Sequence, residues 1–220
     1  MISKITTATI FGIDGIKIDV EVDLSNGLPA FNIVGLPETA VKESKERVRA
    51  AIKNAGFEFP GDRITINLAP ADVRKEGSSF DLPIAIGILT SMGIMKEGVI
   101  KDYLIAGELS LDGRIKGIRG VLPIAILAGK EGIKHIIVPR ENGPEASIVQ
   151  GITVYGAEHL LNIVHFFKGD GEMEQFIDIK TADDGSNEAD GLNFSDIKGQ
   201  PQAKRALEIA ASGGHNILIL

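Results

Sequence analysis

The sequence predicts an α+β fold in which helices pack on a mixed β-sheet. Residues 16–24 alternate apolar and charged side chains, which is the period of a strand with one buried face. Residues 80–92 are almost entirely apolar, which indicates a helix buried on most sides. Strand and helix patterns then alternate along the chain, so antiparallel and parallel strands should share one sheet.

The N-terminal elements follow from turn residues and periodicity. Residues 3–11 are expected to pair with residues 16–24 across a turn at 12–15, and residues 30–34 should form a third strand. A helix is predicted to open at Pro37 and to end near Gly56, with an apolar stripe toward the core. Its opposite face is basic and carries Lys42, Lys45, Arg49 and Lys53.

The second half of the body alternates shorter elements. Residues 63–68 should form a strand, and residues 103–118 a hairpin around Asp112 and Gly113, because this dipeptide tolerates the positive φ angles of a tight turn. The remaining predicted elements are a helix beginning at 122–128, strands at 135–138 and 152–155, and a helix at 158–167.

Length and composition exclude several classes of protein. The 220 residues, 44% hydrophobic and 24% charged, are typical of a globular protein with a buried core. The chain has no cysteine, which excludes disulfide scaffolds, thiolate nucleophiles and zinc–thiolate sites. The N-terminus has no apolar targeting segment, and the longest mainly apolar run, 82–95, is short of a membrane span. We expect a cytoplasmic protein that does not contact membranes.

The net charge of −7 is unevenly distributed. Residues 168–190 carry eight acidic and two basic side chains, a balance of −6, which leaves residues 1–167 at −2 and residues 191–220 at +1. Such an acidic, polar segment buries too little apolar surface to repay the entropy of ordering it. We therefore predict a domain at 1–167, an acidic linker at 168–190 and a separate segment at 191–220. A solvated surface loop of a single domain is the alternative.

The residues before the buried helix are the strongest candidates for chemistry. Ser78 and Ser79 follow Gly77, so backbone N–H groups and hydroxyls there could bind an anion, and a serine near a base could be a nucleophile. A helix cap, with Asp81 in the first turn, is the alternative. The four histidines lack metal-ligand spacing, and no GxxxxGK[ST] phosphate-binding motif occurs, so no metal site is expected.

Several motifs of the body resemble the ComM/YifB family of magnesium-chelatase-related proteins. They are F-N-I-V-G-L-P at 31–37, N-L-A-P-A-D at 67–72, K-E-G-S-S-F-D-L-P-I-A at 75–85, G-E-L-S-L-D-G-R-I-K-G-I-R-G at 107–120 and H-I-I-V-P-R-E-N at 135–142. More distantly, the same segments resemble the proteolytic domain of Lon, whose fold is shared with a ribosomal small-subunit protein. The resemblance implies a Lon-protease-like fold for residues 1–167.

Lon-type peptidases use a Ser–Lys dyad, and the resemblance places Ser79 at the serine position. The surrounding residues differ from the D-G-P-S-A-G context of Lon, and Leu122 stands at the position of the dyad lysine. A serine without its base is a weak nucleophile. We therefore predict a degenerate site without peptidase activity. Lys116 and Arg119 lie near in sequence, so a rearranged dyad is the remaining alternative.

Residues 192–220 resemble the entrance of an AAA+ ATPase module. There, D-I-x-G-Q leads through a basic helix to a buried strand that feeds the Walker A loop, and residues 216–220 are predicted as that strand. The resemblance implies that Ile197 and Gly199 lie on the adenine side of an incomplete nucleotide site. We expect a fragment whose ATPase continues downstream and which binds no cofactor itself. ATP and Mg²⁺ would be cofactors of the full-length protein.

The resemblance implies a hexameric ATPase that acts on DNA, in branch migration during homologous recombination and natural transformation. Residues 1–167 would then serve ring assembly or DNA contact. Five cations form a candidate basic patch for phosphates, with solvated surface charge as the alternative: Arg74, Lys75, Arg114, Lys116 and Arg119. With no Trp and two Tyr, the sequence gives no support for base stacking. A serine hydrolase using Ser79 or Ser78, a magnesium-chelatase subunit and a plain interaction module stay open as alternative functions.

Overall fold

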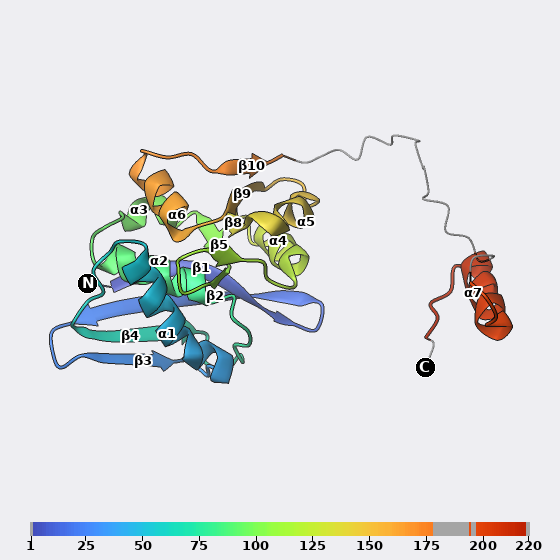
Figure 1. Cartoon of the computed structure of the whole chain (residues 1–220), viewed down its shortest axis with the longest axis horizontal. Helices are drawn as coiled ribbons and strands as arrows, with labels where there is room; N and C mark the ends of the chain where they lie inside the picture. Colours follow the sequence, from blue (N-terminus) through green and yellow to red (C-terminus); the bar gives the residue numbers. More distant parts are fainter. Residues whose placement is uncertain (1, 178–193, 195–196, 219–220) are drawn as a thin grey trace. The chain divides into compact units, whose positions relative to one another are not determined.

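The computed structural model describes residues 2–177, 194 and 197–218. The chain divides into two compact units, unit 1 (Met1–Ile179) and unit 2 (Lys180–Leu220). Unit 1 contains an eight-stranded sheet in the order β10-β9-β8-β5-β1-β2-β4-β3 (Figure 1). The sheet is mixed and carries helices, which confirms the predicted fold class.

The strands of unit 1 form one large and one small sheet. The large sheet contains β1 (Ile2–Phe11), β2 (Asp14–Ser25), β3 (Ala30–Val34), β4 (Arg63–Ala69), β5 (Tyr103–Ile105), β8 (His135–Pro139), β9 (Thr153–Ala157) and β10 (Glu174–Phe176). The small one contains β6 (Glu108–Leu109) and β7 (Ile115–Lys116). β2 pairs antiparallel with both β1 and β4, whereas β1, β5, β8 and β9 run parallel to their neighbours in that order.

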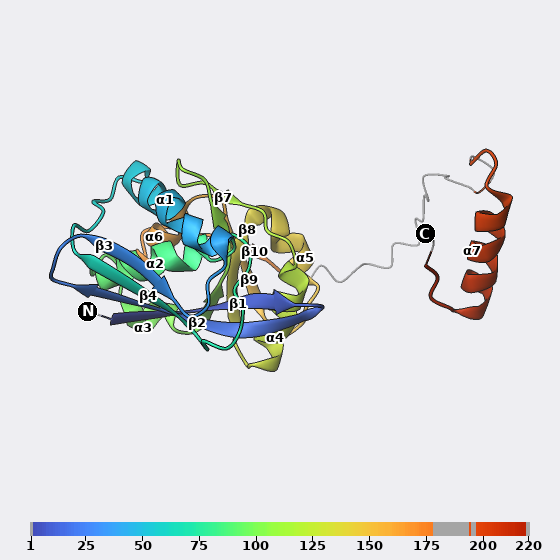
Figure 2. The same ribbon diagram turned by 90° about the horizontal axis from the view of Figure 1, so that it is seen from below.

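Helices cover both faces of the large sheet. They are α1 (Thr39–Asn54), α2 (Asp81–Ser91), α3 (Glu97–Ile100), α4 (Val121–Lys130), α5 (Gly143–Ser147) and α6 (Leu160–Lys168), with a 3₁₀ turn at Arg140–Asn142. The apolar residues of α1, α2 and α6 share one core cluster, and those of α4 and α5 share another. Figure 2 shows α1 and α2 on one side of β1 and β2, with α4 on the other. The two-sided burial explains why Leu104 and Ile105 of β5 and residues 136–139 of β8 are apolar and buried.

The predicted hairpin at 103–118 is wrong in its first part. Tyr103–Ile105 forms β5, which pairs parallel with β1 and β8 inside the large sheet. Leu104 and Ile105 are fully buried, each in a different core cluster, because the strand is covered on both faces. The hairpin is confined to β6 and β7, with Gly113 at φ +88° in its turn as the dipeptide predicts.

The sheet also extends into the segment predicted as a linker. β10 pairs antiparallel with β9, and the Phe176 ring packs over Gly143 and Gly156. A Cβ at Gly143 would lie 2.3 Å from that ring, and a Cβ at Gly156 would lie 2.5 Å from it. Because these two glycines have no side chains, the Phe176 ring can pack directly against their backbone, and this packing orders β10. Residues 178–190 of the predicted linker lie outside the described residues.

Unit 2 contains α7 (Pro201–Gly213), which begins with proline and ends at Gly214 with φ +62°. The strand predicted at 216–220 is not formed at 216–218, where Leu218 is 80% exposed; residues 219–220 lie outside the described part. A strand needs a hydrogen-bonded neighbour, and among the described residues of unit 2 only α7 has regular structure. Of all the helices described in the chain, none is both long and apolar enough to cross a membrane.

Candidate functional site

The two candidate serines lie beside a groove in unit 1. The loop of residues 76–79 leads into α2 and forms one wall of this groove, whose volume is ≈640 Å³. The end of β1, Glu108 of β6 and residues 117–119 beyond β7 form the other walls. We call this the serine groove.

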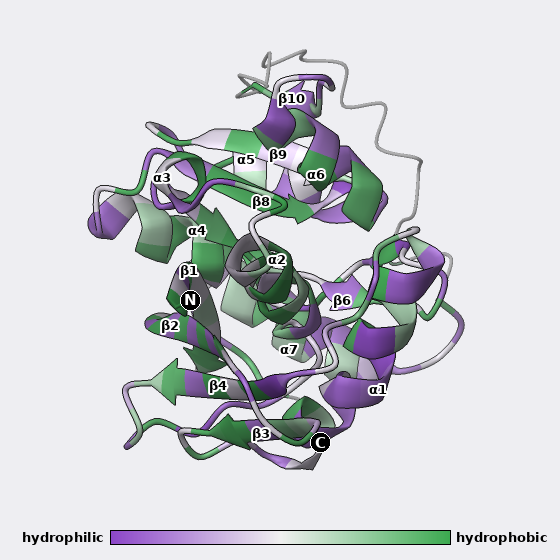
Figure 3. Cartoon of the chain, turned by 90° about the vertical axis from the view of Figure 1, so that its left-hand side faces the viewer, coloured by the Kyte–Doolittle hydropathy of each residue, from purple (hydrophilic) through white to green (hydrophobic). Residues whose placement is uncertain are grey.

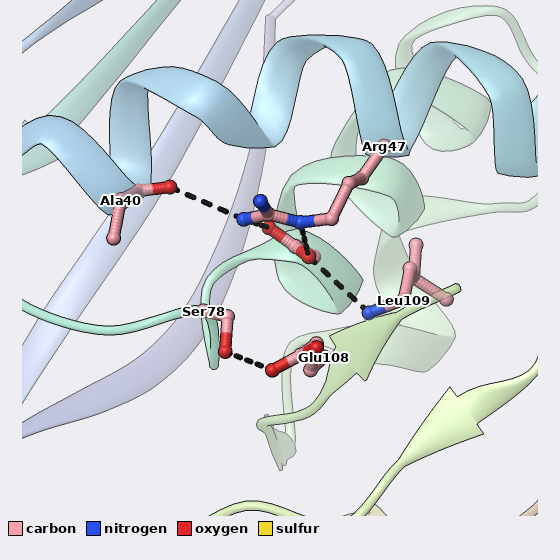
Figure 4. Close-up of polar contacts among 6 residues, drawn as sticks. Ala40, Arg47, Ser78, Glu108 and Leu109 are labelled. Carbon is pink, nitrogen blue, oxygen red and sulfur yellow. Dashed lines mark hydrogen bonds and ion pairs between the residues drawn. The ribbon is translucent and has the colours of Figure 1, made fainter. Parts of the chain in front are cut away.

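The hydrogen bonds of the two serines point to a structural role. The Ser78 hydroxyl donates to the carboxylate of Glu108, which ties the loop to β6 (Figure 4). Ser79 is half-buried, and its carbonyl oxygen accepts the N–H of Gly107 at 3.0 Å. Within the described ranges, no basic side chain hydrogen-bonds to either hydroxyl. Neither serine therefore has a lysine or histidine to accept its proton.

Leu122, which the Lon resemblance assigns to the position of the dyad lysine, cannot act as a base. Leu122 lies in the first turn of α4, and its N–H donates to Glu145 Oε1 at 3.0 Å. Arg119 lines the serine groove, but a guanidinium stays protonated and cannot accept a proton. Lys116 lines a different groove, so the rearranged dyad has no lysine in the serine groove.

Asp81 of the same motif forms an ion pair rather than a helix cap. Its carboxylate is fully buried and accepts from Arg47 of α1, with Nε at 2.6 Å and the second guanidinium contact at 3.0 Å. It also accepts the N–H of Leu109 at 3.3 Å, and Arg47 donates to the carbonyl of Ala40 at 3.1 Å (Figure 4). The N-cap of α2 is Phe80, without a side-chain cap. One residue therefore joins α1, α2 and β6.

Burial sets the pKa of this carboxyl group. Desolvation raises the pKa of Asp81 to about 6, although the hydrogen bond and charge of Arg47 act to lower it. The same contact raises the pKa of Arg47. Since the folded-state pKa exceeds the ordinary value of 3.8, folding favours the protonated form of Asp81.

Unit 1 should therefore lose stability as the pH rises through about 6. The contribution of Asp81 to the free energy of unfolding is fully present below about pH 4. This contribution falls by about 3 kcal/mol once Asp81 ionises in the folded state. In Asp81→Asn, which cannot ionise, this part of the pH dependence should disappear. Urea unfolding of both proteins across this range is the measurement. Parallel pH profiles for the two proteins would contradict the assigned titration.

The five cations of the predicted basic patch do not come together. Lys75 is 0% exposed, and its ammonium donates to the carbonyl of Pro70. A side chain with no exposed surface cannot contact a phosphate group, so the prediction of Lys75 as a phosphate contact is wrong. Burial also lowers the pKa of Lys75. Its backbone pairs with the segment after β3, which draws the side chain inside.

The other four cations are spread over three grooves. Arg74 lies 3.6 Å from Glu38 in one groove, and Arg119 lines the serine groove. Arg114 and Lys116 line a third groove of ≈870 Å³, where Arg140, Glu158 and Glu174 form exposed ion pairs. Arg114 is itself 3.3 Å from Asp112. Neighbouring carboxylates thus offset much of the positive charge that the sequence suggested.

The candidate nucleotide residues lie in unit 2. Ile197 is exposed, and its carbonyl accepts a hydrogen bond from Lys204 of α7. Gly199 has φ +75° just before α7. These two residues offer an apolar side chain and a turn but no group for phosphates. Across the described residues, no three His, Cys, Asp or Glu side chains are grouped to hold a metal ion.

Comparison with known proteins gives the family. Residues 20–142 match the family described as Subunit ChlI of Mg-chelatase, and residues 193–220 match Magnesium chelatase, subunit ChlI. The chain is 44% identical over 210 residues to Competence protein ComM of Haemophilus influenzae, which covers 95% of this chain and 41% of that protein. The chain belongs to the ComM/YifB family of ChlI-related proteins.

One further relative agrees with this ComM/YifB membership, and a Lon protease is similar to part of the chain. The Uncharacterized protein YifB of Escherichia coli is 42% identical over 219 residues, which is 100% of this chain and 42% of that protein. Lon protease 2 of Bacillus subtilis is 28% identical over 141 residues, which is 58% of this chain and 25% of the protease. The ComM/YifB family is an AAA+ family. The fold of unit 1 is Lon-like. The chain spans about two fifths of the length of its ComM/YifB relatives.

Proposed function

We propose that this chain is the non-catalytic N-terminal part of an AAA+ ATPase that acts on DNA. The full-length protein would form a hexamer in the cytoplasm and promote branch migration in homologous recombination and natural transformation. Unit 1 would serve ring assembly or DNA contact. The observation that carries the proposal is the 44% identity, across 95% of the chain, to a relative named for competence.

The serine groove supports the non-catalytic part of the proposal. It has the place of a Lon-type site, yet Leu122 stands where a lysine would be needed and Glu108 holds Ser78. Removing the base leaves a hydroxyl that scarcely ionises near neutral pH. Unit 1 would then act through surfaces that contact DNA or other subunits and not through hydrolysis.

ATP and Mg²⁺ are proposed as cofactors of the full-length protein only. Ile197 and Gly199 would lie beside the adenine, but the sequence has no GxxxxGK[ST] loop to hold phosphates. The purified chain should therefore release no phosphate from ATP above a buffer blank. ATP hydrolysis that copurifies with the chain, and falls when Gly199 is replaced, would contradict the assignment.

DNA contact and ring assembly are separated by two measurements on the purified chain. Fluorescence anisotropy with labelled DNA at low salt tests contact, which should weaken steeply as salt rises. Light scattering after size exclusion tests assembly without DNA. Salt-sensitive binding by a monomer supports DNA contact, and a stable oligomer without DNA binding supports assembly. A monomer that binds no DNA contradicts both roles.

A serine hydrolase is the second candidate, because the Ser78 hydroxyl contacts the Glu108 carboxylate. A carboxylate is a much weaker base than the lysine or histidine that usually activates a serine hydroxyl. We therefore expect no hydrolysis of p-nitrophenyl acetate beyond the background rate of a Ser78→Ala, Ser79→Ala double variant. A faster wild-type rate, with a burst of nitrophenol, would establish this second candidate instead.

A further inference from the structure

A second groove in unit 1 combines cations with aromatic rings. It is lined by α1, by the start of β3 and by the segment that leads into β4, and its volume is ≈220 Å³. Lys45, Arg49 and Lys53 of α1 line one side, at a spacing of four residues that places them on one face of the helix. Phe31 and Phe59 line the other side. We call this the α1 groove.

The two rings form a small aromatic surface. Their centroids are 6.3 Å apart and their planes differ by 19°, and the Arg49 guanidinium carbon lies 5.6 Å from the centre of the Phe59 ring. Both rings are half-buried, and their packing against the core holds this aromatic surface in place. The sequence does not predict this aromatic surface, because its two rings are 28 positions apart and Trp and Tyr are scarce.

The cations of the α1 groove are freer of carboxylates than Arg74 and Arg114 of the predicted patch. In the described part of the chain, no carboxylate forms an ion pair with Arg49 or Lys53, and the Lys45 ammonium lies 4.0 Å from Glu46. Asp62 lines the groove as its one acidic residue. Arg74 and Arg114, in contrast, each have a carboxylate within 3.6 Å. Figure 3 shows α1 largely in the hydrophilic colour beside β3 and β4.

We propose that the α1 groove binds single-stranded DNA, with phosphates on Lys45 and Lys53 and one base taking the place of the Arg49 guanidinium over the Phe59 ring. This inference rests on the proposed DNA contact and moves it from the predicted basic patch to α1. Bases in a duplex are stacked on each other and cannot reach a half-buried ring, whereas an unpaired base can. The groove is smaller than the roughly 300–1,000 Å³ of usual small-molecule pockets, which favours a single ring over a whole cofactor.

The test is fluorescence anisotropy of the purified chain with labelled oligothymidylate over a range of salt concentrations. Lys45→Gln with Lys53→Gln should weaken binding about tenfold and reduce the slope of log K against log salt by about 1.4, since each cation contributes about 0.7. The matched control, Arg114→Gln with Lys116→Gln, removes the same charge from the hairpin groove and should change both quantities little.

The aromatic part of the site has its own test. Phe59→Leu keeps an apolar side chain and should weaken oligothymidylate binding about 5- to 100-fold. It should leave binding of an abasic strand unchanged, and Phe59→Tyr should retain wild-type affinity. Circular dichroism checks that each variant is folded, and the two lysine substitutions, which lie on the surface of α1, provide the independent measurement if Phe59→Leu unfolds.

The binding measurements on the α1 and hairpin variants test the α1 groove and the proposed DNA contact separately. Loss of binding only in the α1 variants supports the inference. Loss only in the hairpin variant overturns the α1 site and leaves DNA contact standing. A wild-type chain that binds no DNA at low salt overturns both. Equal binding of polyglutamate and oligothymidylate, unaffected by Phe59→Leu, would show a general anion surface and also overturn the inference.

Discussion

Replacing Arg47 with alanine should destabilise unit 1 by about 3–5 kcal/mol near pH 7, because it leaves the buried Asp81 carboxylate without its partner. Near pH 4.5 the loss should be much smaller, since Asp81, with a pKa of about 6, is then already protonated in the folded state. Chemical denaturation at both pH values measures the difference.

Arg49→Ala is the control on the same helix. Arg49 is exposed and contacts only the Phe59 ring in the described structure, which at an exposed site is worth about 0.5–1 kcal/mol. Its effect should be small and independent of pH. If Arg47→Ala and Arg49→Ala cost the same at both pH values, the pair between α1 and α2 does not carry the stability assigned to it.

Gly35→Ala should be nearly as damaging, because the glycine of the F-N-I-V-G-L-P motif touches the backbone of β4. Gly35 has φ +95°, and a Cβ there would lie 2.2 Å from the carbonyl oxygen of Leu68. An alanine in the left-handed conformation and a displaced β4 strand both destabilise the fold. Together they should lower the free energy of unfolding by about 2–5 kcal/mol. Thermal and urea unfolding measure the loss.

Gly56→Ala separates the two causes. Gly56 has φ +86°, but a Cβ there would meet nothing within 4 Å. This variant should therefore show only the cost of the backbone conformation, about 1–2 kcal/mol. Equal losses at Gly35 and Gly56 would mean that close approach of β3 and β4 is not why the motif contains glycine.

Periodicity predicted most of the fold because each strand or helix buries one face over a local stretch of chain. The alternation at 16–24 matches β2, whose Ile18, Val20 and Val22 are fully buried. Periodicity failed where order depends on a distant partner. β10 is ordered by Phe176 packing on two glycines, and β5 by neighbours on both sides.

The candidate site was predictable only in part. The motifs pointed to Ser78 and Ser79, which line the serine groove, whereas the assignment of Leu122 to the dyad lysine position stays a prediction. They did not reveal that Asp81 pairs with Arg47, 34 positions away, because such pairing depends on how α1 crosses α2. Lys75 looked like a surface cation in sequence, yet its own backbone pairing carries it into the interior. Charge alone therefore does not locate a phosphate contact.

Unit 1 has a Lon-like fold, and we propose that it lacks peptidase activity. Release of peptides from an unfolded protein, such as reduced casein, by the purified chain and by Ser79→Ala tests this proposal. We expect neither protein to release peptides above a blank without protein. Peptide release by the wild-type chain that is lost in Ser79→Ala would overturn the proposal.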